Sequence, residues 1–281
     1  MRVLVTGARG MLGTDVCSEF RRRGHEVIEA DIAEFDIADA QATHAFATNC
    51  RPGLIVHCAA FTDVDGCERT PEIAFRVNAT GSESIAVAAN SVGARLIAIS
   101  TDFVFDGEKR EPYAESDPMR PLSVYGKSKA EGEDRVRKRC ANHQIVRTSW
   151  LYGRHGKCFP QTILAAARSR SELRVVSDQT GCPTFAGDLA SALAELATID
   201  ATGTFHVSNS EPCTWFEFAR FALDQAGRED VTVTPIASSE WPTPAVRPKY
   251  SVLGPYRWIE AGKKPLRGWR DAYLDYAGSS R

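Results

Sequence analysis

Short apolar runs alternate with amphipathic stretches along the first half of the chain, which is the pattern of strands alternating with helices. The runs of strand type are residues 3–6, 26–31, 54–60, 95–100 and 145–148. The stretches of helical type are one that follows a glycine-rich loop and ends near residue 24, then 40–50, 71–91 and 124–142. Leu54–Ala60 is apolar along its length, as in a parallel sheet that is covered on both faces. The alternation predicts an α/β fold with a Rossmann-like, doubly wound parallel sheet.

The alternation weakens after about residue 150, where proline and glycine punctuate the chain. Helical stretches are expected at 160–169, 185–198 and 215–227, and strand-like runs at 173–176, 203–207 and 231–235. We therefore expect a dinucleotide-binding domain of residues 1–149 and a smaller C-terminal α/β substrate domain of residues 150–281. Part of the second domain, near residues 203–208, is a candidate to return to the first sheet.

Three glycines with the spacing G-x-x-G-x-x-G lie between the first strand and the first helix. Glycine permits a tight turn there, lets backbone N–H groups approach a pyrophosphate, and lets the helix pack close to its strand. This position predicts a bound dinucleotide cofactor. The loop residues assigned to the cofactor are Gly7, Arg9, Gly10, Met11, Leu12 and Gly13.

Two charged residues bear on which dinucleotide binds. Asp31 ends the second strand, where an acid can accept hydrogen bonds from the adenosine ribose and favours NAD. Arg9, inside the glycine loop, can instead pair with a 2′-phosphate and favours NADP. We expect NADPH to be accepted, with NADH as the other candidate.

A phenol and an ammonium follow in the second half of the predicted domain. Tyr125 and Lys129 are four residues apart and share one helix face. A free phenol has a pKa of about 10, and a nearby ammonium favours the phenolate, so Lys129 is expected to lower the pKa of Tyr125 toward the working pH. Thr101 ends the fourth strand and supplies a hydroxyl for a substrate oxygen. Together these residues predict hydride transfer to or from a carbonyl.

Composition excludes several other classes of function. The 281 residues carry a formal net charge of −2, unlike a nucleic-acid binder. The eight cysteines form no C-x-x-C pair and the six histidines no H-E-x-x-H pattern, so no metal site is predicted. His57 and His206 are expected to be hydrogen-bonded core residues. No membrane span or signal peptide is evident, and a cytoplasmic protein is expected.

Beyond these motifs, the chain resembles the dTDP-4-dehydrorhamnose reductases, a family of extended short-chain dehydrogenase/reductases, over nearly its whole length. The segments that carry the resemblance are 6–13, 57–65, 100–107, 125–129, 147–153, 178–184 and 247–251. The last three of these segments are more specific than the motifs that all short-chain dehydrogenases share.

The resemblance implies reduction of the C4 ketone of dTDP-4-dehydro-L-rhamnose to dTDP-L-rhamnose by NADPH or NADH. Tyr125 would protonate the developing alkoxide, Lys129 would tune Tyr125 and hold the nicotinamide ribose, and Thr101 would orient the oxygen. The resemblance also implies contacts near the adenine, along the cofactor and in the substrate pocket. These are Asp36 and Ile37 near the adenine, Ala59, Ala60 and Thr62 along the cofactor, Thr62, Val64, Thr101 and Trp150 around the sugar, and Arg247, with Lys249 as a second candidate, at the nucleotide diphosphate.

The chain departs from the family pattern at two positions. Phe103 stands where the family usually has Tyr, and Cys158 stands where it tends to have Asn. A thiol cannot make the hydrogen bonds of an amide. These departures leave the sugar nucleotide more open than the type of reaction.

Two alternative functions remain at this stage. One is another sugar-nucleotide 4-ketoreductase or epimerase. The other is a non-catalytic binding subunit, because a regulatory subunit of methionine adenosyltransferase resembles the same family. A dTDP-sugar is the expected partner, and the chain is expected to be a monomer or a homodimer. Some members of the family dimerise around Mg²⁺ through acidic side chains, and no such site is placed here.

Overall fold

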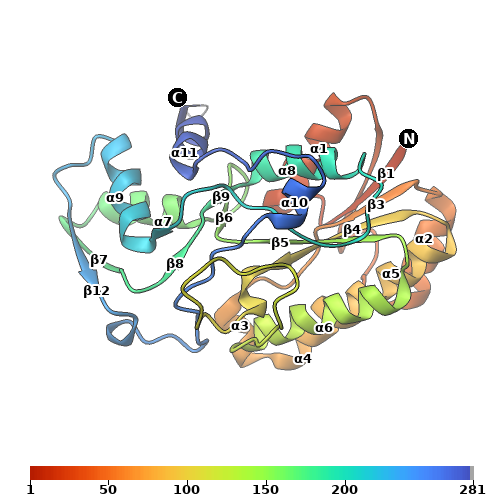
Figure 1. Ribbon diagram of the computed structural model, residues 1–281, viewed down its shortest axis with the longest axis horizontal. Coiled ribbons are helices and arrows are strands. Elements are labelled where there is room, and N and C mark those ends of the chain that lie inside the picture. Colours follow the sequence, from red (N-terminus) through yellow and green to blue (C-terminus); the bar gives the residue numbers. More distant parts are fainter. Residues whose placement is uncertain (279–281) are drawn as a thin grey trace.

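The apolar runs of the first half form the centre of a six-stranded parallel sheet in the computed structural model, which describes residues 1–278 (Figure 1). In spatial order the strands are β2 (Glu26–Ala30), β1 (Arg2–Thr6), β3 (Leu54–His57), β4 (Arg95–Thr101), β5 (His143–Thr148) and β10 (Gly203–His206). All neighbours are parallel. This arrangement confirms the predicted Rossmann-like α/β fold.

Helices cover both faces of this sheet. One face carries α1 (Met11–Arg22) and α8 (Ala186–Leu196), and the other carries α2 (Ala40–Cys50), α5 (Ser82–Ser91) and α6 (Val124–Arg139), as Figure 1 shows. Successive strand side chains point to opposite faces. In β1, Val3 and Val5 accordingly pack in the cluster of α1 and α8, whereas Leu4 packs in the cluster of α5 and α6. This two-sided burial explains why the strands read as continuous apolar runs.

The strand order places a crevice between β1 and β3. From β1 the chain crosses to β2 on one side and then returns to β3 on the other side. In open α/β sheets, ligands bind at such a reversal, beyond the carboxyl ends of the strands. The glycine loop after β1 and residues 58–60 after β3 both lie at this point.

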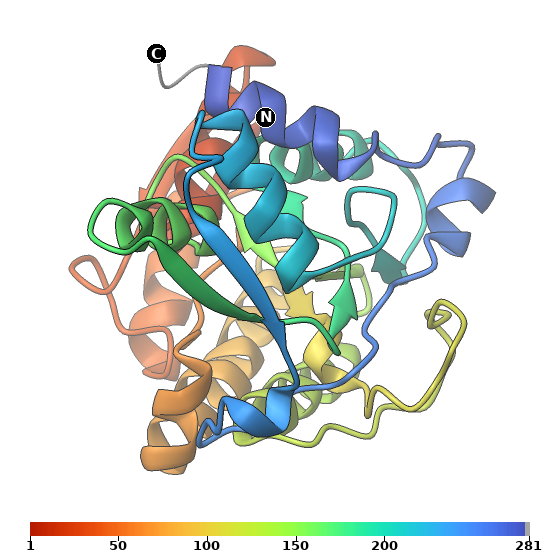
Figure 2. The ribbon, with the colours of Figure 1, turned by 90° about the vertical axis from the view of Figure 1, so that its left-hand side faces the viewer.

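Most of the second half builds a smaller lobe beside the sheet (Figure 1), and this lobe faces the viewer in Figure 2. Its strands β7 (Glu172–Val176) and β12 (Thr232–Ile236) form a parallel pair that packs against α9 (Trp215–Gln225). The other elements of this half are β6 (Leu151–Tyr152), α7 (Phe159–Ala167), β8 (Thr180–Gly181), β9 (Thr184–Phe185), β11 (Cys213–Thr214), a 3₁₀ turn at Ser238–Glu240, α10 (Tyr256–Glu260) and α11 (Trp269–Gly278). The division into two domains at residue 149 stays a prediction.

One predicted helix differs from the structure. The stretch 71–91 is interrupted, because α4 (Pro71–Phe75) and α5 are joined by a π-helical turn, Arg76–Gly81. Asn78 in this turn exchanges hydrogen bonds with the backbone of Phe61, at 2.8 and 3.1 Å. We attribute the wide turn to this exchange, because it brings the Asn78 amide within reach of the loop that follows β3. Such π turns are frequent at functional sites. The short helix α3 (Val64–Arg69) and the 3₁₀ turn Asp102–Val104 are also outside the predicted set.

None of the helices within residues 1–278 is both long enough and apolar enough to cross a membrane.

Candidate active site

A cavity of about 680 Å³ opens at the carboxyl ends of β1, β3, β4 and β5. Every site residue predicted above lines it except Arg9 and the second diphosphate candidate, Lys249. Those that line it are Gly7, Gly10, Met11, Leu12, Gly13, Asp31, Asp36, Ile37, Ala59, Ala60, Thr62, Val64, Thr101, Tyr125, Lys129, Trp150 and Arg247. The structure therefore brings together residues from both halves of the chain.

The glycine loop has the geometry of a phosphate cradle. Gly7 has φ = 67°, and a Cβ added there would lie 2.6 Å from the backbone nitrogen of Ala59. A Cβ on Gly13 would overlap the carbonyl oxygen of Gly7. Helix α1 begins at Gly10 without a side-chain cap, so its first N–H groups are available to an anion. These residues fit the pyrophosphate of a dinucleotide.

Arg9 lies at the edge of the cavity and is already paired. Its guanidinium donates to both carboxylate oxygens of Glu34, at 3.0 and 2.6 Å. The Arg9 backbone N–H donates to Asp31, and the backbone N–H of Asp31 donates to Glu34. The predicted site for the adenosine ribose thus has two carboxylates, Asp31 and Glu34, and one paired cation, and Glu34 was not among the predicted residues.

Three candidate catalytic side chains meet inside the cavity. Helix α6 begins at Ser123, whose hydroxyl accepts a hydrogen bond from the backbone of Gly126 at 3.1 Å. This cap places Tyr125 in the first turn and Lys129 one turn later. The Tyr125 phenol is hydrogen-bonded to the hydroxyl of Thr101 at the end of β4. Lys129 is buried, and its Nζ donates to the carbonyl oxygen of Ile99 at 2.7 Å.

The electrostatics of this trio differ from the expectation in one respect. Burial raises the pKa of Tyr125 above its ordinary value, and the negative charge of Asp102 adds to that effect. The net shift of the phenol pKa is therefore opposite to the expected one, because burial outweighs any effect of the Lys129 ammonium, which is directed to the Ile99 carbonyl. Burial in turn lowers the pKa of Lys129 to about 8, against an opposing effect of Glu133. Tyr125 is protonated at neutral pH, as a proton donor must be.

Two residues next to Thr101 also line the cavity. Thr101 donates to a carboxylate oxygen of Asp102 at 3.0 Å, and burial raises the pKa of Asp102 to about 6. Phe103, which stands in place of the family's Tyr, packs edge-on against the Tyr125 ring with centroids 5.7 Å apart. Asp102 was missed because a strand-terminal Ser-Thr-Asp run has the same form as a simple turn cap.

Two indoles form one wall of the cavity. The rings of Trp150 and Trp215 stack with centroids 3.5 Å apart and an interplanar angle of 5°. Trp150 has φ = 48°, and a Cβ on Gly181 would lie 2.5 Å from its ring, so only glycine fits beneath the indole. Trp215, at the start of α9, was missed because nothing in its local sequence connects it to Trp150.

Other predicted residues have different surroundings from those expected. The Arg247 guanidinium is held by Asp65 at 3.0 and 3.2 Å, so its role toward a diphosphate stays a prediction. Lys249 lies in a neighbouring hollow rather than in this cavity. Cys158 is buried in the aromatic cluster against which Trp150 and Trp215 pack, and it does not line the cavity. The cysteine therefore stands outside the candidate sugar pocket.

The two strand histidines are core residues, as predicted. His57 lies 2.7 Å from the Thr6 hydroxyl, and burial lowers its pKa to about 3. Burial also lowers the pKa of His206 to about 3. Among residues 1–278, no group of three or more His, Cys, Asp or Glu side chains is placed to hold a metal ion.

The parallel sheet, the glycine cradle and the Thr101, Tyr125 and Lys129 cluster define an oxidoreductase of the short-chain dehydrogenase/reductase class. A family model described as the RmlD substrate binding domain matches residues 1–279. The chain belongs to this family.

Proteins similar to this chain include named reductases. The spore coat polysaccharide biosynthesis protein SpsK of Bacillus subtilis is 40% identical over 275 residues, covering 98% of this chain and 96% of its own. A dTDP-4-dehydrorhamnose reductase of Mycobacterium tuberculosis is 38% identical over 278 residues, covering 96% and 90%. The solved structure of a dTDP-4-dehydrorhamnose reductase from Bacillus anthracis in complex with NADP is 36% identical, with a TM-score of 0.96 and 99% of each chain covered.

Proposed function

We propose that the chain reduces the C4 ketone of dTDP-4-dehydro-L-rhamnose to dTDP-L-rhamnose, with NADPH or NADH as the reductant. The observation that carries this proposal is the meeting of Thr101, Tyr125 and Lys129 in one cavity with an uncapped glycine cradle. Membership of the family and the names of the relatives support the dTDP-sugar substrate. The non-catalytic alternative is not favoured by these names.

The protein's own residues supply the proton and the orientation of the ketone. When bound, the nicotinamide supplies the hydride that adds to the C4 carbon. Tyr125 donates its phenolic proton to the C4 oxygen as that oxygen gains charge, and the phenolate then regains a proton from solvent. The Lys129 ammonium stabilises the phenolate, and the Thr101 hydroxyl fixes the oxygen in line with the phenol.

The walls of the cavity suit a sugar nucleotide. The indoles of Trp150 and Trp215 offer apolar surface to a deoxysugar. Val64, at the start of α3, adds a second apolar contact from the opposite domain. Arg247 is the candidate cation for the diphosphate, and binding there requires it to share or exchange its contact with Asp65.

Consumption of the reduced cofactor tests the proposal. Addition of dTDP-4-dehydro-L-rhamnose to the protein with NADPH or NADH is expected to oxidise one cofactor molecule per sugar. The loss of absorbance of the reduced nicotinamide measures this oxidation. An epimerase would convert the sugar with no net loss of reduced cofactor, and a binding subunit would do neither. Folded protein that consumes neither cofactor contradicts the proposal.

Glu34 is expected to set the balance between the two cofactors. Glu34 forms an ion pair with the Arg9 guanidinium and adds negative charge beside the expected position of the adenosine ribose. Both effects disfavour binding of a 2′-phosphate. We expect Glu34→Gln to raise the ratio of kcat/KM for NADPH to that for NADH by about tenfold.

A matched control is Glu29→Gln, which removes the charge of an ion pair with Arg21 outside the cavity. An unchanged ratio in Glu34→Gln, equal to that of Glu29→Gln, would show that Glu34 has no part in cofactor choice.

A further inference from the structure

A third functional side chain lies on the same helix face as Tyr125 and Lys129. Glu133 follows Lys129 by four residues, so the three side chains succeed one another along α6. Only 3% of Glu133 is exposed. A buried carboxylate is costly unless it is paired and hydrogen-bonded, so Glu133 requires partners for its charge.

Four hydrogen bonds satisfy the Glu133 carboxylate. Arg147 donates from Nε at 2.9 Å and from a terminal nitrogen at 2.7 Å, and Arg137 donates at 2.6 Å. The Ser100 hydroxyl donates at 2.5 Å. Burial alone would raise the pKa of Glu133, but the two arginines lower it overall, so the group is an anion.

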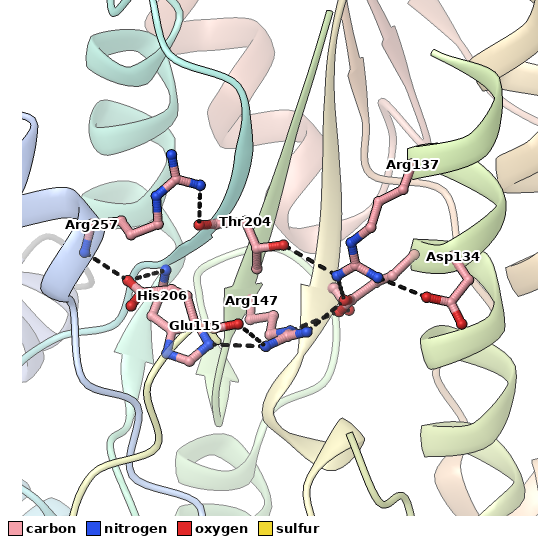
Figure 3. A network of polar contacts seen from close by, with 9 residues as sticks. Glu115, Asp134, Arg137, Arg147, Thr204, His206 and Arg257 are labelled. Atoms are coloured by element: carbon pink, nitrogen blue, oxygen red, sulfur yellow. Dashed lines mark hydrogen bonds and ion pairs between the residues drawn. The ribbon is translucent and has the colours of Figure 1, made fainter. Parts of the chain in front are cut away.

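The contacts of Glu133 join separate elements. Figure 3 shows Arg137 of α6 and Arg147 of β5 converging, with the network continuing to His206 and Arg257. Ser100 belongs to β4 and directly precedes Thr101. The carboxylate therefore ties the helix of the phenol and the ammonium to the strand of the threonine hydroxyl.

We propose that Glu133 is a positioning residue of the active site, which fastens α6 to the end of β4 and supplies the counter-charge for the Lys129 ammonium. This inference rests on the proposed function, because it concerns the same trio. Its role is exerted through Lys129 and Thr101, since Glu133 does not line the cavity.

The charge balance around Lys129 gives the inference a measurable consequence. The titratable and charged groups that surround Lys129 and Glu133 are Tyr125, Arg137, His57, Cys58 and Arg147. Burial lowers the pKa of Lys129, while Glu133 and, to a smaller extent, Cys58 raise it. Loss of the Glu133 charge should therefore let Lys129 lose its proton at lower pH.

Glu133→Gln tests this by titration of Lys129 in the free protein. The carbon next to the Lys129 amine, observed by NMR in protein with labelled lysine, should titrate near pH 8 in the parent chain. In Glu133→Gln the midpoint should fall by about 1 pH unit or more. Glu131→Gln is the control, because Glu131 forms an ion pair with Arg135 on the same helix and is 42% exposed. An unmoved midpoint in Glu133→Gln overturns the inference.

Ser100→Ala provides a second variant that keeps both arginine contacts. Because small misplacements of reacting groups cost up to about 10²-fold, we expect it to lower kcat by about tenfold while leaving the Lys129 midpoint unchanged. A kcat of Ser100→Ala equal to that of the parent chain overturns the proposal that Glu133 fastens α6 to β4. If Glu133→Gln does not fold, Ser100→Ala alone decides this point. The titration of Lys129 needs neither cofactor nor sugar. An inactive parent chain would therefore contradict the proposed function but would leave the result of the Lys129 titration valid.

Discussion

Tyr125→Phe is expected to lower kcat by about 10²–10⁴-fold, because the ring keeps its place while the donated proton is lost. The phenol lies in the cavity beside the Thr101 hydroxyl. Its pKa is raised by burial, so the native residue holds its proton across the neutral range. Steady-state kinetics with the dTDP-4-keto sugar measure the effect.

The same variant should bind the reduced cofactor as tightly as the parent chain does. Fluorescence titration with NADPH or NADH checks this, since the glycine cradle is untouched. Tyr256→Phe is a matched control, because Tyr256 is 46% exposed and does not line the cavity. If Tyr125→Phe had the same kcat as Tyr256→Phe, Tyr125 would not be the proton donor.

Lys129→Met is expected to lower kcat/KM by about 10²–10³-fold, the usual effect of removing a group that stabilises developing charge. The parent chain should also lose kcat/KM as pH rises through about 8, because the ammonium is present below this pKa and lost above it. The variant lacks this group, so its residual activity should not show the alkaline decline. Rate measurements from neutral to alkaline pH test both statements.

Lys127→Met is the control for this prediction, because Lys127 lies on the same helix with its side chain exposed. It should retain parent activity and the alkaline decline. If Lys129→Met kept both the parent activity and the alkaline decline, the Lys129 ammonium would have no part in the reaction.

The elements that the sequence predicted are those whose signals are local. The three glycines, the four-residue spacing of Tyr125 and Lys129 and the apolar strands each depend on neighbours within one or two turns. The parallel order of the sheet then brings the strand ends together, which is why the predicted residues line one cavity.

The features that sequence could not provide depend on contacts between distant segments. Arg247 contacts Asp65 across 182 positions, and the stacking of Trp150 on Trp215 joins the residue before β6 to the start of α9. The direction of the Tyr125 pKa shift follows from burial, which spacing along a helix does not reveal. The π-helical turn likewise depends on Asn78 reaching the backbone of Phe61.

A crystal structure of the protein with an oxidised dinucleotide and the dTDP-4-keto sugar would show whether Tyr125 and Thr101 meet the reacting ketone. We expect the C4 oxygen to lie within about 2.6–3.2 Å of both the Tyr125 phenol and the Thr101 hydroxyl, with the nicotinamide ring facing the C4 carbon. A complex in which the C4 oxygen contacts neither hydroxyl, or in which the nicotinamide lies away from C4, would contradict this expectation.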